Sequence, residues 1–355
     1  MKSIHCSILS LVGLMVFGTG LLFAYDRTQT FEFEGIRSID VKTVCGGLDI
    51  VPGENNQFVV VLENRLDYPE QLEPEVEVSR GRLSIEEDFS GRRVRGGTQW
   101  TVYVPESADL RSVEFSTASG GFTLEGVDVN HVETDIASGG VSIRSVKAKE
   151  LDLSTASGAV EIEDSQVDRV DAESASGGVT AQNVKSEELH LSTASGTVTI
   201  RLCQADYVKA NSASGRVHVS SVSGAEMDLS NASGRIRVKD CDIEESVEMS
   251  CASGDVRAHL GRLPSDFLRA SAVNGDVTLE VTDFGEDFTM TLMKRTDRGR
   301  IKCPFDYTDK ETIRLNRWDR HLTDRYLVQR GRGGPDIELS TVSGTIRIDT
   351  DTRGR

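Results

Sequence analysis

Residues 151–169 have the sequence LDLSTASGAVEIEDSQVDR, and two segments of the same pattern follow, VDAESASGGVTAQNVKSEE (170–188) and LHLSTASGTVTIRLCQADY (189–207). The word Ala-Ser-Gly stands at the same place in each segment. Its glycines recur every 19 residues at Gly120, Gly139, Gly158, Gly177, Gly196, Gly215 and Gly234, and once more after 20 residues at Gly254. A short fixed period is typical of repeat proteins, in which each unit packs against its neighbours.

Apolar residues alternate with polar ones on both sides of each glycine. They stand seven and five residues before it and two and four after it, as Leu151, Leu153, Val160 and Ile162 do around Gly158. A spacing of two indicates β-strands, and no helical stripe competes with it. Two short strands cannot bury a core alone, so the pattern predicts an all-β fold, a parallel β-solenoid with about 19 residues per coil. Parallel crossovers favour right-handed winding, as in a right-handed β-helix.

The Ala-Ser-Gly word is expected to form the corner of each coil. We predict that the alanine is a small residue pointing inward and that the serine hydroxyls form a ladder from coil to coil. The glycine is expected to supply a positive φ at the bend. A row of equivalent serines without a recurring histidine does not suit a nucleophile, which needs a base beside it. The word is therefore interpreted as structural.

The chain divides into four regions. Residues 1–24 hold Lys2 and an apolar run from Ile8 to Ala24, which is typical of a secretory signal peptide. This run is also near the lower limit for a membrane span, so both cleavage and retention as an anchor stay open. Residues 31–110 are predicted to form a first coil plus a strand and hairpin excursion, residues 111–283 the regular array, and residues 284–355 a degenerate coil, a basic aromatic excursion and a closing coil. Within the last region, residues 304–335 either cap the open strand edge or bind a partner.

Composition limits the possible functions. The chain has 57 acidic and 40 basic residues and a net charge of −17, which argues against nucleic acid as a partner. Five cysteines follow the leader, an odd number that leaves at least one of them free, and their disulfide status stays open. Cys203 and Cys241 lie two periods apart, beyond the reach of a disulfide, and are expected to be buried apolar thiols. The sequence shows no metal-ligand spacing, no phosphate-binding loop and no nucleophile elbow, so no catalytic residue, metal or cofactor is predicted.

Basic residues gather at outward positions of the later coils. The candidates for an anion-binding face are Arg201, Arg216, His218, Arg235, Arg237 and Arg257, with Trp318 of the basic excursion as a further candidate. Stacking like charges on adjacent strands is unfavourable, so a face that keeps them is suited to an anionic partner. The other interpretation is that the arginines extend into water or pair with the chain's own acids, such as Asp255.

The corners also carry a resemblance to a known family. Thr-Ala-Ser-Gly or Thr-Val-Ser-Gly followed by alternating Ile and Val resembles the bacterial putative-adhesin family of β-strand repeat proteins. Val104-Pro105 with Ala108 and Leu110, and the segment 333–346, are similar to it as well. The resemblance covers about residues 31–350. It implies a solenoid of the cell envelope, and the family has no established catalytic residues to carry over.

These observations predict a non-catalytic exported protein of the periplasm, cell envelope or cell surface, acting as an adhesin or envelope-binding scaffold. The expected partners are envelope polysaccharide, anionic lipid headgroups or another envelope protein, with membrane contact only through the N-terminal segment if it is not cleaved. Two alternatives stay open. One is a lyase or hydrolase acting on an acidic polysaccharide, which the near absence of insertions between residues 111 and 263 makes less favourable. The other is a regulatory partner of an envelope-stress system.

Overall fold

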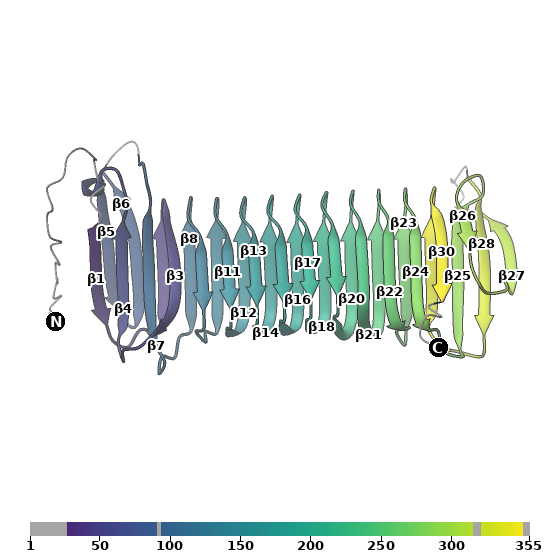
Figure 1. Cartoon of the computed structure of the whole chain (residues 1–355), viewed down its shortest axis with the longest axis horizontal. Coiled ribbons are helices and arrows are strands. Elements are labelled where there is room, and N and C mark those ends of the chain that lie inside the picture. Colours follow the sequence, from purple (N-terminus) through teal and green to yellow (C-terminus); the bar gives the residue numbers. More distant parts are fainter. Residues whose placement is uncertain (1–26, 91–93, 315–320, 351–355) are drawn as a thin grey trace, which may run out of the picture. The chain divides into compact units, whose positions relative to one another are not determined.

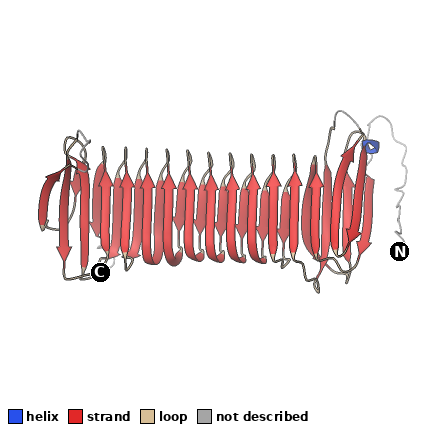
Figure 2. Cartoon of the chain, turned by 180° about the vertical axis from the view of Figure 1, so that it is seen from behind, coloured by secondary structure: helices blue, strands red, loops and turns tan. Residues whose placement is uncertain are grey.

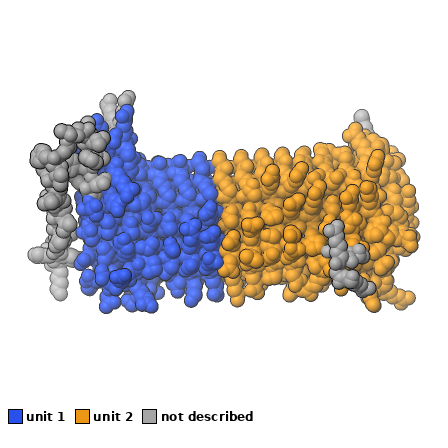
Figure 3. Space-filling view, viewed as in Figure 1, with its two compact units in different colours: residues 1–167 blue, residues 168–355 orange. Residues whose placement is uncertain are grey.

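The structure is a computed structural model that describes residues 27–90, 94–314 and 321–350. The predicted signal or anchor segment and Trp318 lie outside these residues. The described chain consists of β-strands and one short 3-10 helix, η1 (Pro69–Gln71), drawn in blue in Figure 2. No helix in this part of the chain is both long and apolar enough to cross a bilayer. The all-β class is confirmed. The chain divides into two compact units, residues 1–167 and 168–355 (Figure 3).

The first unit begins with a coil that is interrupted by an excursion. Its strands are β1 (Arg27–Phe33), β2 (Ser38–Thr43), β3 (Gly46–Gly53), β4 (Phe58–Asn64), β5 (Leu72–Ser79), β6 (Arg82–Phe89), β7 (Thr98–Pro105), β8 (Ser112–Thr117), β9 (Phe122–Glu125), β10 (His131–Ile136), β11 (Val141–Arg144), β12 (Lys147–Thr155) and β13 (Val160–Glu163). β2 pairs in parallel with β8, and β3 with β9. The excursion contributes the antiparallel β5–β6 hairpin, which turns at Arg80 and Gly81, and β4, which lies antiparallel between β1 and β7.

The regular coils of this unit each place one strand in each of two facing sheets (Figure 1). In one sheet β8, β10 and β12 pair in parallel, which stacks Val113, Val132 and Leu151. In the other sheet, β9, β11 and β13 pair in the same way. Each register step is 19 residues, and the stacked apolar side chains are buried between the sheets. The rings of Phe115 and Phe122 stack across this core with centroids 5.6 Å apart. The predicted alternation therefore builds one continuous apolar core.

The second unit continues the same pattern. Its strands are β14 (Gln166–Ser174), which spans the boundary, β15 (Val179–Gln182), β16 (Lys185–Thr193), β17 (Val198–Arg201), β18 (Gln204–Ser212), β19 (Val217–Ser220), β20 (Ser223–Asn231), β21 (Ile236–Cys251), β22 (Val256–Arg262), β23 (Phe267–Ala272), β24 (Val277–Asp283), β25 (Phe288–Arg295), β26 (Arg300–Lys302), β27 (Asp309–Ile313), β28 (Thr323–Arg330), β29 (Asp336–Thr341) and β30 (Thr345–Thr350). β15, β17, β19, β21, β22 and β24 follow one another in one parallel sheet, here called sheet A.

The last coil in sequence is not the last in space. β29 pairs in parallel with β23 on one side and with β25 on the other, and β30 lies between β24 and β26. The closing coil (yellow β30 in Figure 1) is thus inserted before the degenerate coil of β25 and β26. This corrects the expected chain order of the coils. The 304–335 segment supplies β27 and β28, and β28 covers the outer edge of β25 in antiparallel pairing.

The corner differs from its predicted roles. In the regular coils the alanine and serine are exposed, and the buried inward position is the residue just before them. At this position Thr193 donates its hydroxyl to the carbonyl of Gly177 at 2.8 Å and accepts the amide of Gly196 at 3.0 Å. The same two contacts recur at Thr155, Ser212, Asn231 and Thr341. The ladder exists, but the prediction placed it two residues too late.

The corner residue must be glycine because the neighbouring coil leaves no space for a Cβ atom. A Cβ at Gly158 would overlap with the carbonyl oxygen of Gly139, and one at Gly215 with that of Gly196. The predicted positive φ is present at the corner glycines Gly120 (158°) and Gly139 (154°) but not at Gly158 or Gly215. A second bend six residues later also has positive φ, for example at Asn183 with φ 53°. At Gly158 and Gly215 the need for glycine therefore comes from space alone.

Candidate anion-binding groove

The outer face of sheet A in the second unit carries rows of basic side chains. Every second residue of a strand points to the same face, so the buried Val217 and Val219 leave His218 pointing outward. Parallel pairing places His218 beside Arg237, and Arg237 beside Arg257. Sequence spacing had placed these residues in one row, and the register of the strands brings them together.

The six described candidates surround one depression of about 470 Å³, here called the basic groove. They are Arg201, Arg216, His218, Arg235, Arg237 and Arg257, joined by the short side chains of Thr197 and Thr199 and by the carboxylate of Asp255. Five guanidinium groups against one carboxylate give the groove a net charge of +4 with His218 neutral. The chain as a whole carries −17, so the groove is a local reversal of sign. The candidate Trp318 lies outside the described residues.

Only part of this positive charge is neutralised by the protein itself. The Oδ2 atom of Asp255 lies 3.6 Å from Nε of Arg235 and 3.7 Å from Nη2 of Arg257. Among the described residues, no carboxylate lies within ion-pair distance of Arg201, Arg216 or Arg237. Pairing with the chain's own acids therefore holds for Arg235 and Arg257, whereas Arg201, Arg216 and Arg237 have no carboxylate partner among the described residues.

His218 lies in the middle of this positive field. Partial burial lowers the pKa of its imidazole, and the charges of Arg201, Arg237 and Lys239 lower it further. The neutral ring is thereby favoured near neutral pH in the free protein. A bound anion would offset the positive charges and let the ring accept a proton.

The positive charge decreases toward β24. A neighbouring depression of about 330 Å³ shares Arg237 and Arg257 with the basic groove but also includes Glu280. At its side, Asp240 pairs with Nζ of Lys239 at 3.4 Å and with Nδ1 of His259 at 2.9 Å. The unpaired cations are thus concentrated around β17, β19 and β21.

The degenerate coil and the basic excursion near the C-terminus engage some of their cations internally. Nζ of Lys294 lies 2.9 Å from Asp324, which also accepts hydroxyl hydrogen bonds from Thr296 and Thr312. Burial alone would raise the pKa of Asp324, but these hydrogen bonds outweigh it and lower the pKa. Arg325 pairs with Glu311. Lys294 and Arg325 are therefore less available than the open cations of the basic groove.

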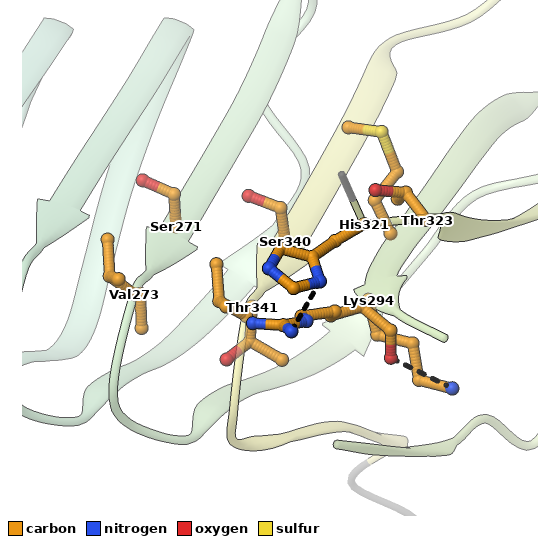
Figure 4. A pocket seen from close by; sticks show the side chains of 11 residues that line it. Ser271, Val273, Lys294, His321, Thr323, Ser340 and Thr341 are labelled. Carbon is orange, nitrogen blue, oxygen red and sulfur yellow. Dashed lines mark hydrogen bonds between the residues drawn. The ribbon is translucent and has the colours of Figure 1, made fainter. Parts of the chain in front are cut away.

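A third depression, of about 290 Å³, lies over β23, β29 and β25 (Figure 4). Its lining is mostly apolar, with Val273, Val342 and Met293, and Nη2 of Arg295 approaches Nδ1 of His321 at 2.5 Å. Sequence reasoning missed it. The available signal was the replacement of the corner alanine by valine at Val273 and Val342.

The chain offers few reactive groups in its described part. No cluster of His, Cys, Asp and Glu there could hold a metal ion. The cysteines in the same part are unpaired, and Cys203 and Cys241 are buried in the core. Burial raises the pKa of both thiols. A protonated buried thiol is a poor nucleophile, so these residues serve packing.

Comparison with known proteins gives a family match. The model of the family described as Toastrack DUF4097 matches residues 71–179 and 166–299. Among curated proteins, none matches the chain. The match agrees with the resemblance that the corner motifs carry.

Three solved structures are similar to the chain at low identity. A putative lipid binding protein from Parabacteroides distasonis ATCC 8503 aligns over 91% of this chain and 96% of its own, with 13% identity and a TM-score of 0.41. A putative adhesin from the same organism aligns over 92% and 98%, with 12% identity and a TM-score of 0.40. A putative adhesin from Bacteroides fragilis NCTC 9343 aligns over 91% and 96%, with 12% identity and a TM-score of 0.33.

Proposed function

The chain belongs to the Toastrack DUF4097 family, and we propose that it is a non-catalytic scaffold that binds an anionic component of the cell envelope through the basic groove. The observation that carries this proposal is a set of arginines in a strongly acidic protein, Arg201 on β17, Arg216 just before β19 and Arg237 on β21, which have no carboxylate partner in the described part of the chain. Acidic polysaccharide and anionic lipid headgroups share the chemistry that this groove recognises, and an acidic envelope protein would share it too.

The physical basis is the relief of repulsion. Like charges at neighbouring positions of adjacent strands destabilise a sheet by a few tenths of a kcal/mol per pair. The register places Arg237 beside Arg257, so an anion bound there offsets this cost and gains charge-assisted hydrogen bonds from guanidinium groups. Binding should therefore weaken as salt rises.

Two further features complete the proposal. The apolar segment 8–24 supports export to the periplasm, envelope or surface, either with cleavage or with retention as an anchor. The 19-residue register steps support coils of about 19 residues, and the rule for parallel crossovers supports right-handed winding. In this architecture the groove lies on a rigid sheet, which limits the conformational entropy lost on binding.

The test is a binding assay with the chain that follows the leader. The probes are phosphatidylcholine vesicles containing phosphatidylglycerol and, separately, soluble polygalacturonate. The groove variant combines Arg216→Glu, Arg235→Glu, Arg237→Glu and Arg257→Glu. The matched control combines Arg144→Glu, Arg169→Glu, Arg262→Glu and Arg269→Glu, which changes the net charge equally at sites outside the groove.

We expect wild type to bind at least one probe and the groove variant to lose about tenfold or more in affinity. The control should lose clearly less. An equal loss in both variants would mean that only net charge matters, and it would contradict a defined groove. No binding of either probe by wild type would reject the anion-binding function.

A further inference from the structure

Leu202 in the second unit combines a left-handed backbone conformation with an exposed apolar side chain, and both are energetically unfavourable. The positive-φ bend six residues after the corner glycine is formed by Ser145, Asp164, Asn183, Leu202, Ser221 and Asp240, with φ between 51° and 54°. Five of these residues are short and polar. Leu202 has the same left-handed backbone with a large apolar side chain.

A leucine at this bend does not stabilise the fold. The left-handed conformation costs a residue with a Cβ about 1–2 kcal/mol, while Asn and Asp adopt it more readily. The side chain of Leu202 does not recover that cost by burial, because the residue is 62% exposed. The bend itself needs only backbone groups, since the amide of Leu202 donates to the carbonyl of Ser220 at 3.1 Å as Asn183 donates to Arg201 at 3.0 Å.

The position of Leu202 connects it with the basic groove. It follows Arg201 directly, at the end of β17, and Arg201 lines the groove without a carboxylate partner. The equivalent residue one coil further, Ser221, follows Ser220 at the end of β19. An exposed apolar residue thus directly follows Arg201, one of the open cations of the groove.

We propose that the ligand of the basic groove is an anionic lipid surface, with Leu202 entering the interface while Arg201, Arg216 and Arg237 contact headgroup phosphates. This inference rests on the proposed function and names its ligand class. Binding to a lipid surface combines electrostatic attraction with the burial of apolar side chains at the headgroup boundary. A hydrated acidic polysaccharide would satisfy the same cations but would leave Leu202 in water.

The test uses Leu202→Asn, which places at this bend the residue type found at Asn183. On phosphatidylglycerol-containing vesicles the variant should bind roughly three- to tenfold more weakly than wild type, because the apolar contact is lost. On polygalacturonate its binding should equal that of wild type. Its thermal unfolding midpoint should rise, because the left-handed strain is relieved. Leu202→Phe, which keeps an apolar side chain, should retain vesicle binding.

The outcomes separate this inference from the function on which it rests. If Leu202→Asn binds vesicles as tightly as wild type, or if wild type binds polygalacturonate but not vesicles, the lipid inference is wrong and the anion-binding groove stands. If wild type binds neither probe, the proposed function itself fails. A lower unfolding midpoint in Leu202→Asn would show that the leucine stabilises the bend, and it would overturn the argument from strain.

Discussion

The outer face of the parallel strands has opposite character in two regions of the same repeat. On β11 and β13 of the first unit, Arg144 is neutralised by Glu161 at 3.7 Å and by Glu163 at 3.1 Å. On β17, β19 and β21 of the second unit, the same outward positions hold Arg201, His218 and Arg237, for which the described residues provide no such partners. Backbone pairing and inward apolar columns are alike in both regions. The repeat thus supplies a common scaffold, and the outward residues give each region its own chemistry.

The largest expected effect tests whether the scaffold is common to both regions. Gly158→Ala in the first unit and Gly215→Ala in the second should each destabilise the protein by about 3 kcal/mol or more, because the new Cβ overlaps with a carbonyl oxygen of the preceding coil. Chemical denaturation measures the change. Gly261→Ala, where the Cβ meets nothing within 4 Å, is the control and should be nearly neutral. A mild effect at only one of the two corners would break the comparison.

The buried hydroxyl ladder should matter equally in the two regions. Thr155→Val and Thr193→Val each leave a partly buried carbonyl and a partly buried amide without their side-chain partner. We expect each to lower the free energy of unfolding by about 1–3 kcal/mol. Thr199→Val, on the outer face, should change it little. Equal values for all three variants would show that the ladder is not what stabilises the corner.

Exchanging the outward residues should transfer the function. Glu161→Arg combined with Glu163→Gln removes both partners of Arg144 and gives the first unit an unpaired basic pair. Affinity for anionic vesicles should then rise several-fold over wild type at low salt. The same double change made at Glu75 and Glu77 of the hairpin strand β5 is the control for net charge. Equal gains in both variants would mean that position on the sheet is unimportant.

The smallest effect concerns pH and His218. Its pKa is lowered in the folded protein, chiefly by burial and further by Arg201 and Arg237. The unfolded state therefore takes up the proton first, and stability is lost as pH falls from about 6.5 toward the lower folded pKa. At low salt, His218→Gln should lose less thermal stability than wild type between pH 7.5 and 5.5. An anionic ligand should reverse the trend and bind wild type more tightly at the lower pH. Identical pH profiles would contradict this role of His218.

Much of the scaffold could be predicted because alternation of apolar residues has a direct structural meaning. Leu151, Leu153, Val160 and Ile162 are buried as their spacing requires. The error at the corner came from stopping that alternation too early. Thr155 continues the inward series two residues after Leu153, and extending the period would have placed its hydroxyl inside and Ala156 outside.

Other features depend on contacts that no local pattern encodes. Leu339 and Ile346 lie on β29 and β30, which pair directly with β23 and β24, whereas Leu292 and Ile301 lie on strands one coil further out. Chain order does not determine which coil pairs with β23 and β24. The members of the basic groove could be predicted, because the outward register follows from the period. Its division into paired and open arginines could not, since it depends on how far the side chain of Asp255 reaches.

The most direct test of the central claim locates the bound anion on the unmodified protein. Arginine-selective labelling with a dicarbonyl reagent, read by mass spectrometry, would be compared with and without phosphatidylglycerol vesicles. The account predicts protection of Arg201, Arg216 and Arg237, with Arg144 labelled equally in both samples. Uniform labelling across all four, or protection confined to the basic excursion at Arg325 and Arg330, would contradict it.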